Sequence, residues 1–418
     1  ASGASQTGFG RTGTVNWNTT KITSDPGPAV SGVGYFTDTS GSAFNVTLPS
    51  SPSAGDIIAV ADYAGTWGSN NLTILRNSSN IEGEAENFLC NTGGSAITFV
   101  YVDATKGWIT INSGNSNQAF KNPFICATGG TITTSGDCKI HTFTGPGCFT
   151  VNSISAIDDA RNEVSYVVVA GGASGGRYAG GGGGAGGYRE VKTPLTPYTA
   201  SPLNGYPNGP NIVTVTETNF PITVGGGGAA VSGCANGTAG SVSSFSTITS
   251  AGGGGGGGTY NTGGTAGGSG GGGSGGSTGS AGGSGAAGNT PPVSPPQGQS
   301  GGNGNGPTAQ HEAGGGGGAG AVGGNASGGS AGTGGAGVTS SINGTPTARS
   351  GGGGGAVQCG STGPGGSGGG GAGGRPPSST EAGAGTVNTG GGGGGAAFGP
   401  RASGAGGSGI VIIRYKFQ

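Results

Sequence analysis

The serine motif of this chain is the feature that most resembles an enzyme site. Residues 172–176 read Gly-Ala-Ser-Gly-Gly around Ser174 and match the G-x-S-x-G pattern of serine hydrolases. With 111 glycines in 418 residues, such a match arises by chance. The motif lacks the strand-to-helix turn that would expose the serine, and no downstream histidine is placed as its base. Glycine-rich nucleotide motifs fail similarly, because no helix or lysine completes them. We therefore expect no catalytic residues.

A glycan-degrading enzyme is the remaining catalytic alternative. Such an enzyme needs a pair of carboxylates facing each other across a cleft. The glycine-rich half supplies few acids, chiefly Glu312 and Glu381. We expect no hydrolysis of capsular or lipopolysaccharide glycans.

Acids, histidines and cysteines are also poorly arranged for metal binding. Asp158, Asp159 and Glu163 offer carboxylates, but their spacing matches no calcium loop and favours a polar turn. The six cysteines form no C-x-x-C pair, and the two histidines, His141 and His311, lie far apart. His141 alternates with Lys139 and Phe143, as an ordinary strand residue would. We expect no metal site and no cofactor.

Two cysteines occur in similar contexts and raise the question of a disulfide. Cys90 and Cys126 each follow an aromatic–aliphatic pair and precede a Thr-Gly-Gly turn. A disulfide between them and two buried free thiols are both consistent with these contexts.

Side chains between the long glycine runs are the better candidates for binding chemistry. Arg177-Tyr178 and Arg375-Pro376 place a planar cation beside an aromatic ring or a rigid backbone, which suits stacking on sugars or pairing with acidic glycans. His311-Glu312 lies in a loop, where receptor contact and a solvated turn are both consistent with the sequence. The candidate binding residues are Arg177, Tyr178, Tyr260, His311, Glu312, Arg375 and Arg401.

Charge and hydropathy narrow the classes of partner. The net charge is −1, only 7% of residues are charged, and no basic cluster suits a phosphate backbone. No apolar stretch approaches the roughly 18 residues of a membrane span. We expect neither nucleic-acid binding nor membrane insertion. We also expect no signal peptide ahead of Ala1, although a removed initiator methionine and a cleaved leader would leave the same start.

The first part of the chain predicts short strands. Segments 56–62, 72–75 and 97–102 are rich in β-branched or aromatic residues and are bounded by turn formers, and 108–111 completes a hairpin with 97–102. No capped run has helical periodicity. We expect a sandwich or barrel-like β module over residues 1–120 and a β-hairpin connector over 121–165, with strand 138–144 turning back as 148–151.

Residues 166–418 predict an ordered glycine-rich domain rather than a flexible linker. More than a third of the residues after Ala170 are glycine, in pure runs that alternate with strand-like pieces such as 166–170, 220–224 and 410–413. Polyglycine II rods, with about 3.1 Å rise per residue, would allow the backbone to bond to several neighbouring rods. A Cβ inside such a lattice would push rods apart. A glycine-rich β-sheet is the structural alternative.

The non-glycine segments between runs would then be turns at the ends of a slab of rods. Rigid rods that display adaptable loops are the arrangement expected of a binding surface. These segments are 177–178, 198–211, 259–262, 289–300, 307–312, 375–381 and 398–401.

The order of these pieces resembles the glycine-rich domain of bacteriophage tail-fibre proteins. Tyr166 to Gly172, the run 180–187 followed by Tyr-Arg-Glu, Ile222 to Gly227, 243–258 and 406–415 carry the likeness over roughly Thr131 to Gln418. Residues 34–39 through 101–108 resemble β modules in fibres of phages that infect marine and freshwater bacteria, including cyanobacteria.

The resemblance implies an extracellular virion component, often trimeric, whose distal loops contact a host-surface molecule. It is similar to tip adhesins of T-even-like phages, in which polyglycine II rods carry binding loops. This chain departs from them because β modules precede its glycine half, which leaves monomer, trimer and filament open.

The expected function is therefore that of a tail-fibre adhesin. Its expected partners are a host cell-surface glycan or outer-membrane protein, with assembly as a homotrimer or fibre. The alternative is a structural subunit of an extracellular filament or a passive fibre shaft.

Overall fold

The chain folds into two units, Ala1–Asn122 and Pro123–Gln418. The computed structural model describes residues 15–111, 124–155, 159–306, 310–376 and 381–418. Within these residues the helical elements are two short 3-10 turns, Asp159–Asn162 and Gly209–Asn211, and all other regular elements are strands. The expected all-β fold without substantial helix is therefore confirmed. The predicted boundary between residues 120 and 121 lies outside the described residues.

The first unit consists of two sheets. The larger has the order β1-β2-β4-β7-β8, with the hairpin β7-β8 in the predicted place, where Tyr101 faces Trp108. The smaller has the order β3-β5-β6. The bounds are β1 (Asn16–Ile22), β2 (Val33–Thr37), β3 (Phe44–Thr47), β4 (Ile57–Asp62), β5 (Leu72–Leu75), β6 (Phe88–Cys90), β7 (Ala96–Asp103) and β8 (Gly107–Ile111).

Alternating apolar side chains of these strands form the core of the first unit. Trp67 and Trp108 are fully buried in it, together with Phe88 and Phe99, whose rings meet edge to face at 5.3 Å. The indole of Trp67 donates a 3.0 Å hydrogen bond to the hydroxyl of Thr37. The polar end of this large side chain is therefore satisfied inside the core.

The second unit begins with two facing sheets. One has the order β10-β11-β21-β13-β14, with β15 also paired to β13, and the other has the order β18-β17-β16-β12-β9. A hairpin, β19-β20, forms a separate two-stranded sheet. The bounds are β9 (Cys126–Thr128), β10 (Thr131–Ser135), β11 (Cys138–Phe143), β12 (Gly147–Ser153), β13 (Glu163–Val169), β14 (Tyr188–Val191), β15 (Val213–Thr214), β16 (Asn219–Thr223), β17 (Ser243–Phe245), β18 (Ile248–Ser250), β19 (Val338–Ser340), β20 (Thr347–Arg349) and β21 (Ile410–Lys416).

The central strands β13 and β21 are buried on both faces. Tyr166 and Val168 point into the core between the two sheets, whereas Val167 and Val169 join a second core on the opposite face. Successive side chains of a strand alternate between faces, so a continuous apolar run fits a strand that is covered twice. The strands expected near 166–170, 220–224 and 410–413 are all present.

The predicted hairpin between residues 138–144 and 148–151 is wrong. β11 pairs with β10 and β21, whereas β12 pairs with β16 and β9 in the other sheet. The intervening turn carries the chain across the core, to which Phe143 and Phe149 both contribute from opposite layers. Residues 124–155 are consequently part of the second unit's sandwich and do not form a separate connector.

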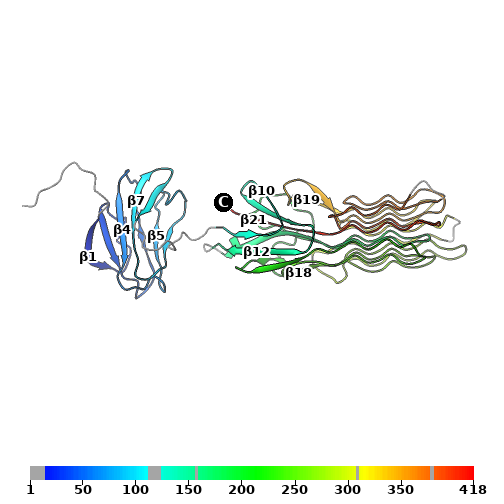
Figure 1. Cartoon of the computed structure of the whole chain (residues 1–418), viewed down its shortest axis with the longest axis horizontal. Helices are drawn as coiled ribbons and strands as arrows, with labels where there is room; N and C mark the ends of the chain where they lie inside the picture. The colour runs from blue at the N-terminus through cyan, green and yellow to red at the C-terminus, as the bar shows by residue number, and fades with distance from the viewer. Residues whose placement is uncertain (1–14, 112–123, 156–158, 307–309, 377–380) are drawn as a thin grey trace, which may run out of the picture. The chain divides into compact units, whose positions relative to one another are not determined.

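Beyond the sheets the chain forms a slab of polyglycine II rods (Figure 1). The rod of residues 180–187 is buried among six other segments, and its bonding partner changes with a period of three. N–H groups 181 and 184 donate to carbonyls 257 and 254, 182 and 185 donate to 314 and 317, and 183 and 186 donate to 393 and 390, at 2.8–3.0 Å. Its carbonyls accept from residues 170–176, 269–272 and 353–356. A threefold period is that of the polyproline II helix, whose backbone groups point outward.

Close contact between rods explains the glycine runs. A Cβ added to Gly182 would lie 2.0 Å from the carbonyl oxygen of Gly353. The exclusion of side chains is not complete, however, because Ala173 and Ala185 are fully buried within rods. A methyl group is therefore accepted at selected positions, which corrects the expectation that any Cβ pushes the rods apart.

Candidate functional site

Several turns meet at the end of the slab that lies away from the sheets. The segment 170–176 continues from β13, reverses at Arg177 and Tyr178, and returns along 180–187 to β14. Backbone hydrogen bonds join this reversal to two other turns at the same end of the slab. Thr259 N–H donates to Arg177 O at 3.0 Å, and Tyr178 N–H donates to Ala396 O at 3.1 Å. We call this end the tip; it is the right-hand end of the slab in Figure 1.

Four aromatic rings from four separate turns form a cluster at the tip. The tip aromatic cluster consists of Tyr178, Tyr260, His311 and Phe398, all half-buried. Tyr178 contacts Phe398 with centroids 4.2 Å apart and Tyr260 at 5.4 Å. His311 lies 4.8 Å from Tyr260 and 5.4 Å from Phe398. The structure thus brings together three of the predicted residues and a phenylalanine that we had placed in a turn without choosing it as a site residue.

The backbone of these turns is held in an unusual conformation. Positive φ angles occur at Tyr178 (75°), Ala179 (58°), Thr259 (57°), Asn261 (60°) and His311 (48°). Such angles cost free energy for residues other than glycine and persist only where the surroundings enforce them. The backbone conformations of Tyr178 and His311, two members of the aromatic cluster, are therefore enforced by the neighbouring rods.

Arg177 and His311 stabilise the tip from within. The Arg177 guanidinium donates to the carbonyl of Arg401 at 2.8 Å and also to that of Gly399. The Nδ1 atom of His311 lies 2.7 Å from the carbonyl of Gly276 and must carry the hydrogen, because a carbonyl only accepts. Both predicted residues are at the tip, and both anchor neighbouring turns.

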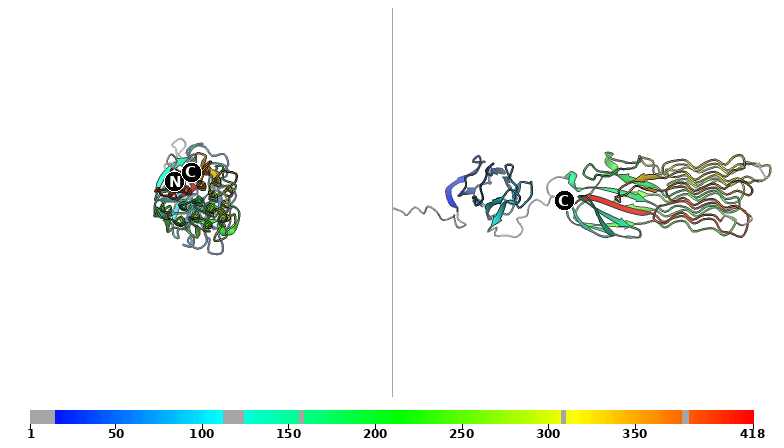
Figure 2. Two further views of the ribbon diagram at one scale, coloured as in Figure 1. Left: turned by 90° about the vertical axis from the view of Figure 1, so that its right-hand side faces the viewer. Right: turned by 90° about the horizontal axis from the view of Figure 1, so that it is seen from above.

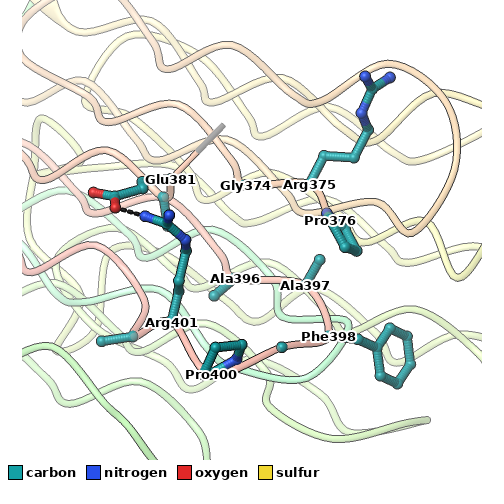
Figure 3. A pocket seen from close by; sticks show the side chains of 12 residues that line it. Gly374, Arg375, Pro376, Glu381, Ala396, Ala397, Phe398, Pro400 and Arg401 are labelled. Carbon is teal, nitrogen blue, oxygen red and sulfur yellow. Dashed lines mark ion pairs between the residues drawn. The ribbon is translucent and has the colours of Figure 1, made fainter. Parts of the chain in front are cut away.

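A pocket of about 190 Å³ opens beside the aromatic cluster (Figure 3). Arg401 and Glu381 form an ion pair at its edge, with side chains 50% and 70% exposed. Arg375 also contributes, but its side chain extends away from that pair and donates to the carbonyl of Gly360 at 2.8 Å. The pocket, which we call the tip pocket, is lined mainly by Gly374, Pro376, Glu381, Ala396, Pro400 and Arg401.

The comparisons with known proteins concern the rods and sheets of the second unit. A family model described as a glycine-rich domain matches residues 149–416, more than half of the chain. This chain belongs to that glycine-rich domain family. None of the curated proteins compared with the sequence matches it.

Glu312, one of the predicted binding residues, is instead an internal residue of the glycine-rich domain. It is fully buried, and its carboxylate accepts hydrogen bonds from the side-chain amide of Asn305 and the backbone N–H of Gly329. The sequence placed it correctly beside His311, but successive residues at this turn face opposite ways. A buried carboxylate needs such partners, so its role is structural.

Two of the predicted turns lie at the sheet end of the slab and not at the tip. Segments 198–211 and 289–300 are joined beside β14, where Asn211 donates to Ser294 O at 2.9 Å and Tyr188 N–H donates to Gln297 O at 2.8 Å. They cover the sheet end of the slab. Residues 307–309 and 377–380 of two other turns lie outside the described residues.

Of the two alternatives for Cys90 and Cys126, the disulfide is absent and both thiols are free. Cys90 is fully buried in the core of the first unit, where burial raises the pKa of its thiol, and Cys126 is exposed on β9 of the second unit. All six cysteines are free. Cys90 ends β6 whereas Cys126 begins β9, so the similar local sequences did not indicate a bond.

Neither a metal site nor a membrane span is found in the part of the chain that the structure describes. No group of three or more His, Cys, Asp or Glu side chains there is arranged to hold an ion. No helix among the same residues is long and apolar enough to cross a bilayer. Asp158 of the acidic trio lies outside the described residues, and Glu163 begins β13.

Proposed function

We propose that this chain is the receptor-binding adhesin of a bacteriophage tail fibre and that its tip recognises a host-surface glycan or outer-membrane protein. The proposal gives the chain a binding role rather than a catalytic one, on the outside of a virion. The observation that carries it is the convergence of Tyr178, Tyr260, His311 and Phe398 from four turns at one end of the slab.

The scaffold beneath the cluster supports a binding role. The described residues of the cluster lie directly beside rods that bond to several neighbours, so little conformational freedom of these residues remains to be lost on binding. Aromatic rings with few rotatable bonds and arginines are the side chains that most often dominate recognition surfaces. Loops on a rigid framework are also where binding residues concentrate.

The chemistry at the tip supports a polar surface molecule as the partner. Half-buried aromatic rings present apolar faces on which sugar rings stack, and Arg375 and Arg401 add planar donors beside them. Only Glu381 among the described acids lies at the pocket edge. The resemblance to phage fibre proteins supports a bacterial cell surface as the source of this molecule.

Cell binding by the full chain tests the proposal. Fluorescently labelled protein is expected to bind susceptible bacteria and to compete with adsorption of the phage. Tyr260→Ala should weaken binding about tenfold or more, because central aromatic anchors carry much of an interface's energy. Tyr63→Ala is the matched control, because Tyr63 is 58% exposed on the first unit. Absence of binding to every susceptible strain, or equal losses for both variants, would overturn the proposal.

A structural subunit of a filament or fibre shaft is the second candidate. The feature that favours it is β1, a seven-residue edge strand with nearly all of its residues exposed, which offers free backbone groups to another strand. Electron microscopy of the isolated protein separates the two functions. Open-ended polymers would favour the filament, whereas single particles or closed trimers that bind cells would favour the adhesin.

A further inference from the structure

We infer that the tip pocket binds one sugar residue through a pair of adjacent hydroxyl groups, with Glu381 and Arg401 as the recognising side chains. This inference rests on the proposed function, since it names the class of ligand that the tip would recognise. It differs from that proposal in assigning a defined site and two residues that we did not single out together from the sequence.

The size of the pocket limits the ligand. A volume of about 190 Å³ is smaller than the roughly 300–1,000 Å³ of sites that enclose a whole drug-sized molecule. It has room for one ring, with the rest of a larger ligand outside. The terminal residue of a glycan chain fits this description.

The walls of the pocket favour a sugar ring. Ala396, Ala397 and Gly374 are among its lining residues and offer little besides apolar atoms and backbone. Pro376 and Pro400 line it further with rigid rings (Figure 3). Flat apolar surfaces of this kind match the C–H faces of a pyranose, and they require little ordering when the ligand binds.

The ion pair at the edge favours hydroxyl groups over a charged ligand. A carboxylate accepts on two oxygens and a guanidinium donates through five N–H groups, so the pair retains acceptors and donors after its mutual contact. Two adjacent hydroxyls can donate to Glu381 and accept from Arg401 together. The two charges of this pair balance, and the guanidinium of Arg375, the remaining charged lining residue, extends away from the pair to the carbonyl of Gly360.

The position of the pocket agrees with this assignment. Gly399 and Arg401 lie on the turn that Arg177 holds through two carbonyls, and Phe398 of the same turn belongs to the tip aromatic cluster. The turn that carries Arg401 is therefore held next to the rings on which the remainder of a glycan would lie.

Saturation-transfer NMR with the full chain tests the inference. The probes are methyl glycosides of glucose, galactose, mannose and N-acetylglucosamine at millimolar concentration. At least one should receive saturation from the protein, and Glu381→Gln should reduce its affinity about tenfold, since hydrogen bonds to a charged group are lost. Glu217→Gln, the same change at an exposed residue remote from the tip, should have no effect.

The outcomes separate this inference from the proposed function. Saturation of none of the glycosides, or equal saturation of the wild type and Glu381→Gln, overturns the sugar site. If the same protein still binds host cells, the adhesin proposal stands and a protein receptor is indicated. If a glycoside binds in a Glu381-dependent manner but no susceptible cell is bound, the sugar site stands and the adhesin proposal fails.

Discussion

The Nε2 atom of His141 lies 3.1 Å from the hydroxyl oxygen of Tyr415 in the interior of the second unit. The two rings stack with centroids 5.5 Å apart, and Nδ1 of His141 lies 2.7 Å from the carbonyl of Gly129. Since a carbonyl only accepts, Nδ1 carries the hydrogen and Nε2 accepts from Tyr415. The neutral imidazole is therefore fully bonded. Burial lowers the pKa of His141 below 6.5, and the positive charge of Lys139 acts in the same direction.

This arrangement predicts that the second unit is less stable in mild acid. The unfolded chain takes up a proton on His141 near pH 6.5, whereas the folded chain resists it, so stability is lost as the pH falls through that value. Denaturant unfolding followed by circular dichroism at pH 7.5 and pH 5.5 measures the effect. His141→Gln should remove much of the difference. His311→Gln, which changes the only other histidine, should retain it, and the opposite pattern would contradict the assignment.

The packing of the rods predicts that some glycines cannot be replaced without loss of stability, whereas others tolerate a larger residue. A Cβ at Gly255 would lie 1.9 Å from the carbonyl oxygen of Gly237, whereas one at Gly226 would meet nothing within 4 Å. Gly255→Ala should therefore lower the free energy of unfolding of the second unit by about 1–3 kcal/mol or more. Gly226→Ala should be neutral or slightly stabilising, because alanine restricts the unfolded chain.

The tryptophans supply an internal control for this comparison. All three lie in the first unit, so tryptophan fluorescence follows that unit alone. Gly255→Ala should shift the thermal transition seen by circular dichroism and leave the fluorescence transition in place. Equal melting of Gly255→Ala and Gly226→Ala would show that the rods do not require bare backbone.

The sequence predicted local structure and rod formation well, because both depend on nearby residues. Val167 and Ile412 lie in apolar runs that indicate doubly covered strands, and the purity of the run 252–258 indicates packing that admits no side chain. Each of these signals is contained in a few consecutive residues.

Partners distant in sequence were not predictable in the same way. β11 lies beside β21, which follows more than 250 residues later, and nothing in the turn at Gly145 indicates that the chain changes sheets there. The burial of Glu312 depends on Asn305 and Gly329, which belong to different turns. Phe398 follows a glycine run much as Tyr260 does, and this repeated pattern was the available signal for the aromatic cluster.

The cysteines predict a defined pattern of thiol reactivity. Cys126, Cys148, Cys234 and Cys359 are exposed, whereas Cys90 and Cys138 are buried. The four exposed thiols should react rapidly with a maleimide in the native protein, whereas the two buried thiols should react only after unfolding. Mass spectrometry of labelled peptides identifies the sites. Protection of Cys126 together with Cys90 under non-reducing conditions would indicate a disulfide between them, contrary to the structure.

Two arginines at the tip predict separate effects on two turns. Arg177 donates to the carbonyls of Gly399 and Arg401, and Arg375 donates to the carbonyl of Gly360. Arg177→Ala should accelerate amide hydrogen exchange around 398–402, because that turn loses two anchoring hydrogen bonds. Arg375→Ala should do so only around 358–361. Exchange mass spectrometry of both variants measures this, and each is the control for the other. If either variant loosened both turns equally, the tip would be one cooperative unit and the two anchors would have no separate roles.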